Sequence, residues 1–111
     1  MTVDITTVGR RSGEPTRIEI WMFEVDGRFV ITGTPGPRDW YANLLADPLL
    51  TIHVKTGLAV DLDAIATPVA DPSVRRRVFE APHTSWYRTQ STIEDLVANS
   101  PMVEVRFPAL G

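Results

Sequence analysis

Residues 9–15 (Gly-Arg-Arg-Ser-Gly-Glu-Pro) place two guanidinium groups and a hydroxyl between two glycines. Glycines let backbone amides approach a bound anion, and the planar forks of Arg10 and Arg11 suit paired hydrogen bonds to a phosphate or a carboxylate. These residue types predict a site for an anionic tail in this segment, which we call the anion loop. A polar turn whose arginines face solvent or pair with Glu14 is the structural alternative.

A second segment, residues 32–41, is rich in small residues with free backbone groups and includes Thr34 and Gly36. Because it leads into a predicted helix, it suits a planar heterocycle that forms hydrogen bonds along one edge. Trp40 and Tyr41 end this segment. On a short amphipathic helix these two side chains fit the core as well as a ligand contact.

Aromatic side chains mark further positions that could line a pocket. His83, Trp86 and Tyr87 stand close together between two predicted helices, and Trp21 stands on an apolar strand. Simple packing explains these residues equally well. His53 and His83 fit no metal spacing, so no metal site is predicted. The sequence shows no arrangement of serine, histidine and carboxylate, so an enzyme of this sequence would depend on a bound cofactor for its chemistry.

The composition excludes several classes of protein. The chain has 111 residues, of which 43% are hydrophobic and 23% charged, as expected of one globular domain spanning residues 1–111. The net charge of −3 argues against nucleic-acid binding. The chain has no cysteine for a disulfide or a thiolate site. No apolar run reaches the ~20 residues of an integral membrane segment, and the first residues do not resemble a signal peptide, which predicts a cytoplasmic protein.

Arginine accounts for ten of the eleven basic residues, and Lys55 is the one lysine. Arg10, Arg11 and Arg17 fall in or beside the anion loop, which predicts a local basic site within a mildly acidic chain. The arginine run at residues 75–77 falls on a predicted helix, and we interpret it as a solvated face.

The elements that must position these residues follow from the spacing of apolar side chains. Alternation predicts strands at residues 3–8, 17–25, 28–34, 49–55, 58–69 and 102–107, with an Asp26-Gly27 hairpin turn after the second. Helical spacing and capping residues predict helices at residues 38–46, from Asp71-Pro72 onward, and from the capping box at residues 91–94 to about residue 98. This pattern predicts an α+β fold, a six-stranded antiparallel barrel with two to three peripheral helices.

Two motifs, residues 6–15 and residues 40–48 (Trp-Tyr-Ala-Asn-Leu-Leu-Ala-Asp-Pro), resemble those of the deazaflavin-dependent nitroreductase and quinone reductase family. The similarity covers residues 5–55 and continues weakly to residue 107. The resemblance implies a split β-barrel akin to the flavin-binding pyridoxamine-phosphate-oxidase barrels. It also implies the cofactor coenzyme F-420, a hydride carrier with a phosphate and polyglutamate tail. Thr16 and Arg11 depart from the family pattern, which often has arginine and lysine at these two positions.

The resemblance also implies roles for individual residues. The arginines, serine and second glycine of the anion loop would hold the tail, Thr34 would lie by the deazaflavin ring, and Trp21 would line the cavity for ring and substrate. Trp86 and Tyr87 fall in the segment that supplies substrate-side aromatic groups, and Tyr87, His83 or water would donate the proton. The predicted cofactor-binding residues are Arg10, Arg11, Ser12, Gly13, Arg17, Trp21, Thr34 and Gly36.

The expected activity is hydride transfer from reduced F-420 to a quinone, a nitroaromatic or an activated enone, with the reactants positioned in a dry slot. Two alternatives stay open. The same loop could hold FMN by its single phosphate, or the protein could hold a deazaflavin or another planar ligand without turnover. The expected partner is a small-molecule substrate. A homodimer is an option because the two-sided apolar strand around Trp21 needs more cover than one small core offers.

Overall fold

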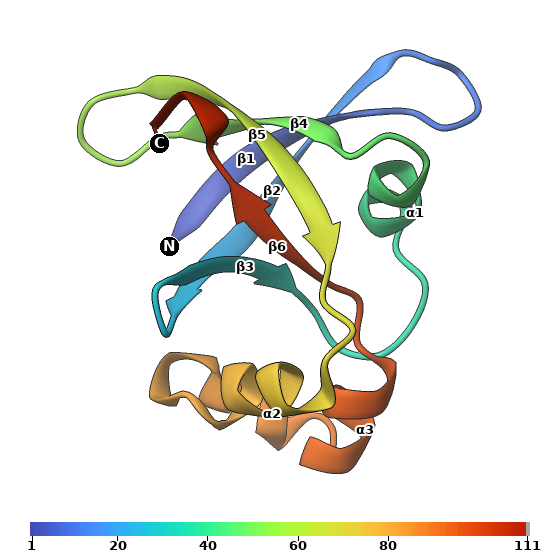
Figure 1. Cartoon of the computed structure of the whole chain (residues 1–111), viewed down its shortest axis with the longest axis vertical. Helices are drawn as coiled ribbons and strands as arrows, with labels where there is room; N and C mark the ends of the chain where they lie inside the picture. The colour runs from blue at the N-terminus through green and yellow to red at the C-terminus, as the bar shows by residue number, and fades with distance from the viewer. Residues whose placement is uncertain (111) are drawn as a thin grey trace.

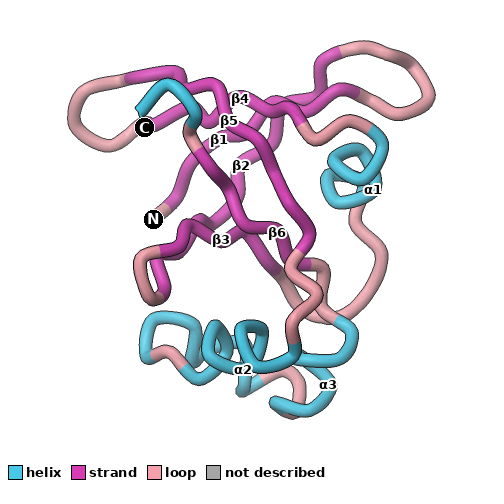
Figure 2. Tube along the Cα trace, viewed as in Figure 1, coloured by secondary structure: helices cyan, strands magenta, loops and turns pink. Residues whose placement is uncertain are grey.

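A computed structural model describes residues 1–110, and Gly111, the last residue of the predicted domain, lies outside the described part. Figure 1 and Figure 2 show the strands gathered into one barrel, with a layer of helices below it in this view and α1 at its side. The label η marks 3-10 helices. In chain order the elements are β1 (Thr2–Val8), β2 (Pro15–Val25), β3 (Arg28–Thr32), α1 (Asp39–Ala46), β4 (Leu49–Val54), β5 (Val60–Pro68), α2 (Pro72–Glu80), η1 (Pro82–Thr89), α3 (Ile93–Asn99), β6 (Met102–Arg106) and η2 (Pro108–Leu110).

The six strands form a closed barrel in the order β1-β2-β3-β6-β5-β4, and every neighbouring pair is antiparallel. The β2–β3 hairpin turns at Asp26 and Gly27, whose φ angles of 52° and 78° are those that a tight two-residue turn requires. The strand bounds differ from the predicted ones by at most two residues; β2, for example, begins at Pro15 and β3 ends at Thr32. The predicted antiparallel barrel is confirmed.

Alternate side chains of the strands fill the interior of the barrel. Val3 and Ile5 of β1 and Val105 of β6 belong to one apolar cluster, to which α1 adds Trp40 and Leu44. Because Trp40 is buried in this cluster, it holds α1 against the barrel. Of the two interpretations offered for Trp40, the structure supports the core residue.

A second apolar cluster lies between the outer face of the barrel and the helical layer of α2, η1 and α3. Phe23 and Val30 of the barrel pack there with Phe79, Tyr87 and Leu96 of the helices. All five side chains are almost fully buried. The protein therefore has two cores, one inside the barrel and one under the helices, and β2 and β3 contribute to both.

The helical layer is an excursion between two strands that pair directly. β5 leaves the barrel at Pro68 and β6 re-enters it at Met102, while Pro68 stands opposite Val103 in the β5–β6 ladder. The amide of Val69 donates to the carbonyl of Met102 at 3.1 Å, which closes the base of the excursion. No helix in residues 1–110 has the length and apolar character needed to cross a membrane.

The helix starts follow the expected capping chemistry with one displacement. The side chain of Asp71 accepts from the amide of Ser73 at 2.9 Å and begins α2 as predicted. The cap of α3 is Thr92, whose hydroxyl accepts from the amide of Asp95 at 3.2 Å. The predicted box that starts at residue 91 is therefore wrong by one residue. The segment that connects α2 to α3 forms the 3-10 helix η1.

Arg75 corrects the interpretation of residues 75–77 as a solvated face. It is only 9% exposed. Its guanidinium donates to the carbonyls of Val97 at 2.6 Å, Val69 at 2.8 Å and Ser100 at 2.5 Å. Arg75 thus fastens α2 to the end of α3 and to the chain leaving β5. Its neighbours in the run are exposed, as predicted.

β2 changes its pairing partner along its length. Residues 22–25 pair with β3, whereas residues 15–21 pair with β1 alone. In the described chain, one edge of residues 15–21 therefore presents backbone donors and acceptors with no strand beside them. This open edge begins at the anion loop and ends at Trp21.

Candidate functional site

The anion loop is a closed turn between β1 and β2. The amide of Gly9 donates to the carbonyl of Glu14, and the amide of Gly13 donates to the carbonyl of Gly9, both at 2.8 Å. Gly13 has a φ of 71°, which favours glycine. A Cβ at residue 9 would come within 2.6 Å of the Ser12 hydroxyl oxygen, so the turn also requires glycine there. The Ser12 oxygen accepts from the amide of Glu14 at 3.1 Å, which leaves its own hydrogen for another partner.

Arg10 is held by α1. Its backbone amide and its guanidinium donate to Oδ1 of Asn43 at 3.1 Å and 3.0 Å, and the guanidinium also lies 3.2 Å from Asp39. Asn43 is 3% exposed, and its amide nitrogen donates to the hydroxyl of Thr7 at 3.3 Å. Asn43 therefore joins the anion loop, α1 and the barrel wall.

The other two predicted arginines of this region are more accessible. Arg11 is exposed and has no hydrogen-bond or ion-pair partner among residues 1–110. Arg17, on β2, pairs with Asp4 at 3.0 Å, and its side chain is 54% exposed. Exposed ion pairs contribute little free energy, so this pairing exchanges readily for a ligand anion. The donor set of three guanidinium groups, a serine hydroxyl and a glycine turn fits an anionic cofactor tail.

Residues 34–38, which we call the junction loop, fold around the guanidinium of Arg38. Arg38 donates to the carbonyl and the hydroxyl oxygen of Thr34 at 3.1 Å and 3.0 Å, and to the carbonyl of Pro37 at 3.1 Å. Gly36 has a φ of 131°, and a Cβ there would lie 3.2 Å from the Arg38 guanidinium. Because Thr34 only accepts in these bonds, its hydroxyl hydrogen is available to a ligand.

Five aromatic side chains form a contiguous group, which we call the aromatic cluster. Phe23 is its centre: its ring lies 6.2 Å from Trp21, 5.7 Å from His83 and 6.0 Å from Tyr87 between centroids. Trp86 stacks on Tyr87 at 4.0 Å. The structure thus brings together the predicted Trp21, His83, Trp86 and Tyr87 through a residue that the sequence reasoning missed. The signal was present, since Phe23 is two residues from Trp21 and so shares its face of β2.

Part of the aromatic cluster lines a hollow of about 440 Å³. Its lining consists of Met1, Trp21, Met22, Phe23, Glu24, Phe29 and His83. Trp21 is 49% exposed and Trp86 44% exposed, so both present an indole face to solvent. A mostly apolar hollow with one imidazole suits a small planar molecule.

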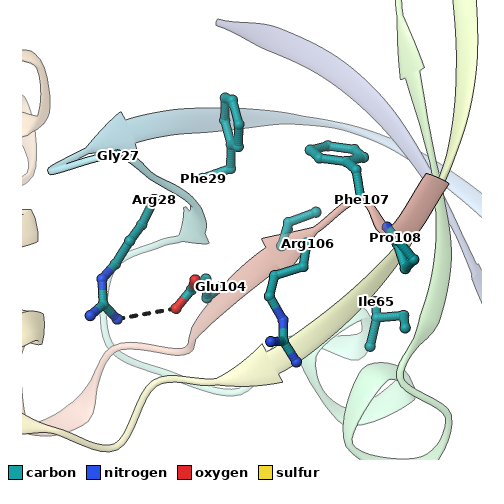
Figure 3. Close-up of a pocket in the computed structure, with 9 residues that line it drawn as sticks. Gly27, Arg28, Phe29, Ile65, Glu104, Arg106, Phe107 and Pro108 are labelled. Atoms are coloured by element: carbon teal, nitrogen blue, oxygen red, sulfur yellow. Dashed lines mark hydrogen bonds and ion pairs between the residues drawn. The ribbon is translucent and has the colours of Figure 1, made fainter. Parts of the chain in front are cut away.

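A neighbouring hollow of about 570 Å³ shares Phe29 with the first. Figure 3 shows Phe29 and Phe107 side by side in its lining, with their rings in edge-to-face contact, and Arg28 joined to Glu104. None of the predicted site residues lines this hollow. It lies by the β2–β3 turn, on the other side of the molecule from the anion loop in Figure 1.

The two candidate proton donors differ in accessibility. Tyr87 is 3% exposed, and its hydroxyl is directed at the carbonyl of Thr32, 3.5 Å away. Burial raises the pKa of the Tyr87 hydroxyl to about 12. His83 is exposed, and its Nε2 donates to the carbonyl of Glu24 at 2.9 Å, which leaves Nδ1 free to hold a proton. His83 is therefore accessible to solvent, whereas the side chain of Tyr87 is not.

A polar group on the outer face of β1, β4 and β5 was not visible in the sequence. His53 is buried there; its Nε2 lies 2.6 Å from the Thr6 hydroxyl and its Nδ1 lies 2.7 Å from Asp61. The three residues come from three paired strands, so only the register of the sheet brings them together. The backbone around these residues belongs to the β1–β4 and β4–β5 ladders. We interpret this line as a cross-strand support.

Asp4 and Lys55 extend this polar face. They lie 2.7 Å apart, and Lys55 also pairs with Glu19 of β2. The hydrogen bond from Lys55, reinforced by Arg17, lowers the pKa of the Asp4 carboxyl. Asp4 and Glu19 in turn raise the pKa of Lys55. Both groups are charged at neutral pH and hold β1, β2 and β4 together on the outside.

Comparison with known proteins agrees with this geometry. The chain resembles the conserved hypothetical protein Rv2991 from Mycobacterium tuberculosis (18% identity over 96% of this chain and 72% of that one, TM-score 0.72). It also resembles an F420-H2 dependent reductase, FDR-A (19% identity, 95% and 93% covered, TM-score 0.65). A third similar structure is a putative pyridoxamine 5'-phosphate oxidase from Listeria innocua (10% identity, 96% and 82% covered, TM-score 0.70).

At these identities the solved structures establish the split-barrel fold. No curated protein matches the sequence closely enough to count as a relative. The sequence profile of the F420H(2)-dependent quinone reductase family, however, matches residues 2–106, nearly the whole chain. The match spans the anion loop, the junction loop and the aromatic cluster. The chain therefore belongs to the F420H(2)-dependent quinone reductase family and is an oxidoreductase whose cofactor is coenzyme F420.

Proposed function

We propose that the protein reduces a small planar acceptor, a quinone, a nitroaromatic or an activated enone, bound at the aromatic cluster. Bound reduced F420 supplies the hydride. The observation that supports this proposal most strongly is that Trp21 and His83, predicted separately, border one apolar hollow with Phe23 between them. Such a hollow can orient a planar acceptor beside the cofactor, and hydride transfer depends on this positioning.

The anion loop is proposed to hold the cofactor tail. Arg11 and Arg17 offer exposed guanidinium groups, while Ser12 and Gly13 shape the turn, and Arg10 contributes from its position against α1. Pro15 and Trp21 are six positions apart on β2, which is about 20 Å along a strand. An elongated cofactor can thus follow the open edge of β2 from the anion loop to the aromatic cluster.

The ring of the cofactor is proposed to lie between the junction loop and Trp21. Thr34 has a hydroxyl hydrogen to donate to it. Trp21 offers an exposed indole face for stacking. Trp86 is proposed to cover the acceptor.

His83 is proposed to hold the proton that completes the reduction, at Nδ1. A His83→Asn variant keeps a polar group near the carbonyl of Glu24 but lacks the second ring nitrogen that would carry the proton. We expect a lower kcat, with the Kd for F420 unchanged. A kcat in the variant equal to that of the parent protein would exclude this role.

Cofactor binding by the anion loop is tested with matched arginine variants and isothermal titration calorimetry. Removal of a hydrogen bond to a charged group costs about 1.5–3 kcal/mol, so Arg11→Ala should raise the Kd for F420 about tenfold or more. Arg106→Ala is the control, because Arg106 is an equally exposed arginine on β6. An unchanged Kd in the Arg10→Ala, Arg11→Ala double variant would show that the tail binds elsewhere.

The acceptor class is tested by mixing the protein and reduced F420 with a quinone, a nitrobenzene and a cyclic enone, and following cofactor oxidation. Oxidation by at least one of the three is expected. Trp86→Ala should raise the KM for that acceptor more than it changes the Kd for F420. Failure of all three acceptors with a protein that binds F420 would overturn the proposed substrate class.

We also propose a homodimer. One solved structure described as a domain-swapped dimer resembles this chain (20% identity, 95% and 79% covered, TM-score 0.65). The outer face of β1, β2 and β4 exposes Val8, Trp21 and Leu49, which a second copy could cover. Light scattering on the purified protein tests this assembly. The cytoplasmic location stays a prediction from the sequence.

A further inference from the structure

A hollow of about 500 Å³, separate from the aromatic cluster, lies where four segments meet. Its walls come from the junction loop, from Tyr41 of α1, from Arg75 of α2 and from the end of α3 at Ser100. The polar Asn99 and the apolar Val69, Ala70, Ala98 and Pro101 complete the lining, and no acidic side chain of residues 1–110 borders it. We call it the Arg75 hollow.

Arg75 brings a buried positive charge to this hollow without a carboxylate to balance it. Its three hydrogen-bond partners are backbone carbonyls, and it has no ion-pair partner among the described residues. A guanidinium has five N–H groups, so two of them are free of these three bonds. Buried charges in proteins are normally paired, because an isolated charge is costly away from water. Burial accordingly lowers the pKa of Arg75.

Ser100 supplies an independent observation at the same place. The residue is 5% exposed, and its Oγ is the buried side-chain polar atom of the described chain that has no hydrogen-bond partner. A fastening role for Arg75 explains its three bonds to carbonyls, but it does not explain an unpaired buried hydroxyl beside a cavity. Buried polar atoms without a partner are rare in native proteins and often mark a missing ligand or water.

From the unbalanced guanidinium, the unpaired hydroxyl and the cavity that both residues line, we propose that the Arg75 hollow binds a small molecule through its carboxylate group. Arg75 would contact the carboxylate and the Tyr41 hydroxyl would complete its shell, while the Ser100 hydroxyl, which is buried beside the hollow in the free protein, would turn toward the carboxylate on binding. A single carboxylate balances the single charge of Arg75, whereas a phosphate dianion would leave a net negative charge in the same walls. The apolar part of the lining suits a short hydrocarbon body attached to the carboxylate.

The carboxylate belongs to a free organic acid, because the anion loop, which shares no residue with this hollow, is the proposed site of the cofactor tail. The first experiment uses the protein without cofactor, so its outcome does not depend on the proposed function. Butyrate is titrated by calorimetry and by the shift in Tm, with butyramide as the neutral molecule of the same shape. We expect butyrate to bind at least about tenfold more tightly than butyramide, as for a hydrogen bond to a charged group.

Variants locate the binding. Ser100→Ala and Tyr41→Phe should each weaken butyrate binding about tenfold or less, and Ser100→Ala should not lower the Tm of the free protein, because the lost hydroxyl has no partner to leave behind. Arg75→Gln should abolish binding if the variant folds. Arg76→Gln, which makes the same charge change on the exposed face of α2, is the matched control and should bind butyrate normally.

Competition with the cofactor tests this assignment. F420 and butyrate should bind independently. If excess butyrate raises the apparent Kd for F420 and Ser100→Ala raises it too, the hollow belongs to the cofactor site and the proposal of a separate acid is overturned. Equal binding of butyrate and butyramide, or butyrate binding that persists in the Ser100→Ala, Tyr41→Phe double variant, would overturn the proposal.

Discussion

The contact of Asn43 with the anion loop makes the sharpest prediction for stability and binding together. Asn43→Ala removes three hydrogen bonds: those from the amide and the guanidinium of Arg10, at 3.1 Å and 3.0 Å, and that to the Thr7 hydroxyl at 3.3 Å. Each contributes a net of about 1 kcal/mol, and the partly exposed guanidinium gives no more than that. The variant should therefore lose about 3 kcal/mol of unfolding free energy, or roughly 12 °C in Tm for a domain of this size.

Chemical denaturation followed by circular dichroism measures this loss, and titration with F420 measures the effect on the loop. We expect a weaker affinity for F420, because Arg10 keeps only its contact with the exposed Asp39. Asn43→Asp is the matched control. Its carboxylate still accepts both bonds from Arg10 and can accept from the Thr7 hydroxyl, so it should lose much less stability. A loss below about 1 kcal/mol in Asn43→Ala, or an equal loss in Asn43→Asp, would refute the role assigned to Asn43.

Three further variants test separate features. Gly9→Ala places a Cβ 2.6 Å from the Ser12 hydroxyl oxygen and should cost about 1–3 kcal/mol by thermal denaturation, with part of the loss restored in a Ser12→Ala background. Asp4 has a pKa below its ordinary value of 3.8 because of Lys55 and Arg17. Its contribution to stability is therefore present above that value and lost as the pH falls further, so acid should destabilise Asp4→Asn less than the parent protein. The contribution of Lys55 to the stability of the fold is lost only in strong alkali, because the pKa of Lys55 is raised above its ordinary value of 10.5. Tyr87→Phe should keep its packing and change kcat little, since the hydroxyl is buried; a large fall in kcat, with the Kd for F420 unchanged, would restore Tyr87 as the proton donor.

The barrel could be predicted because its hairpins are local. Asp26 and Gly27 between two alternating runs specify the turn, the register and the face of each side chain, so the β2–β3 hairpin follows from neighbours in the sequence. The ends of the strands are predicted less exactly. Thr32 ends β3 two residues early, where its hydroxyl donates to the carbonyl of Pro101 at 2.6 Å. That contact joins residues far apart in the chain, so alternation alone could not reveal it.

The site was predicted by residue type and missed where partners come from distant segments. The arginines of the anion loop were visible as chemistry, but the contact of Arg10 with Asn43 needs α1 folded against β1. Thr6, His53 and Asp61 meet only through the pairing of three strands. Arg75 looked solvated because it stands in a charged run, and its burial depends on where α3 ends.

The excursion of residues 69–101 carries one part of the site, and the barrel carries the other. Its two ends meet at the bond between Val69 and Met102, so the β5–β6 ladder is complete without it. His83, Trp86 and Tyr87 all belong to this excursion, whereas the anion loop and the junction loop belong to the barrel hairpins and their connections. Replacing residues 69–101 with the corresponding segment of a relative would therefore change the acceptor preference. The cofactor-binding loops and the barrel would stay as they are.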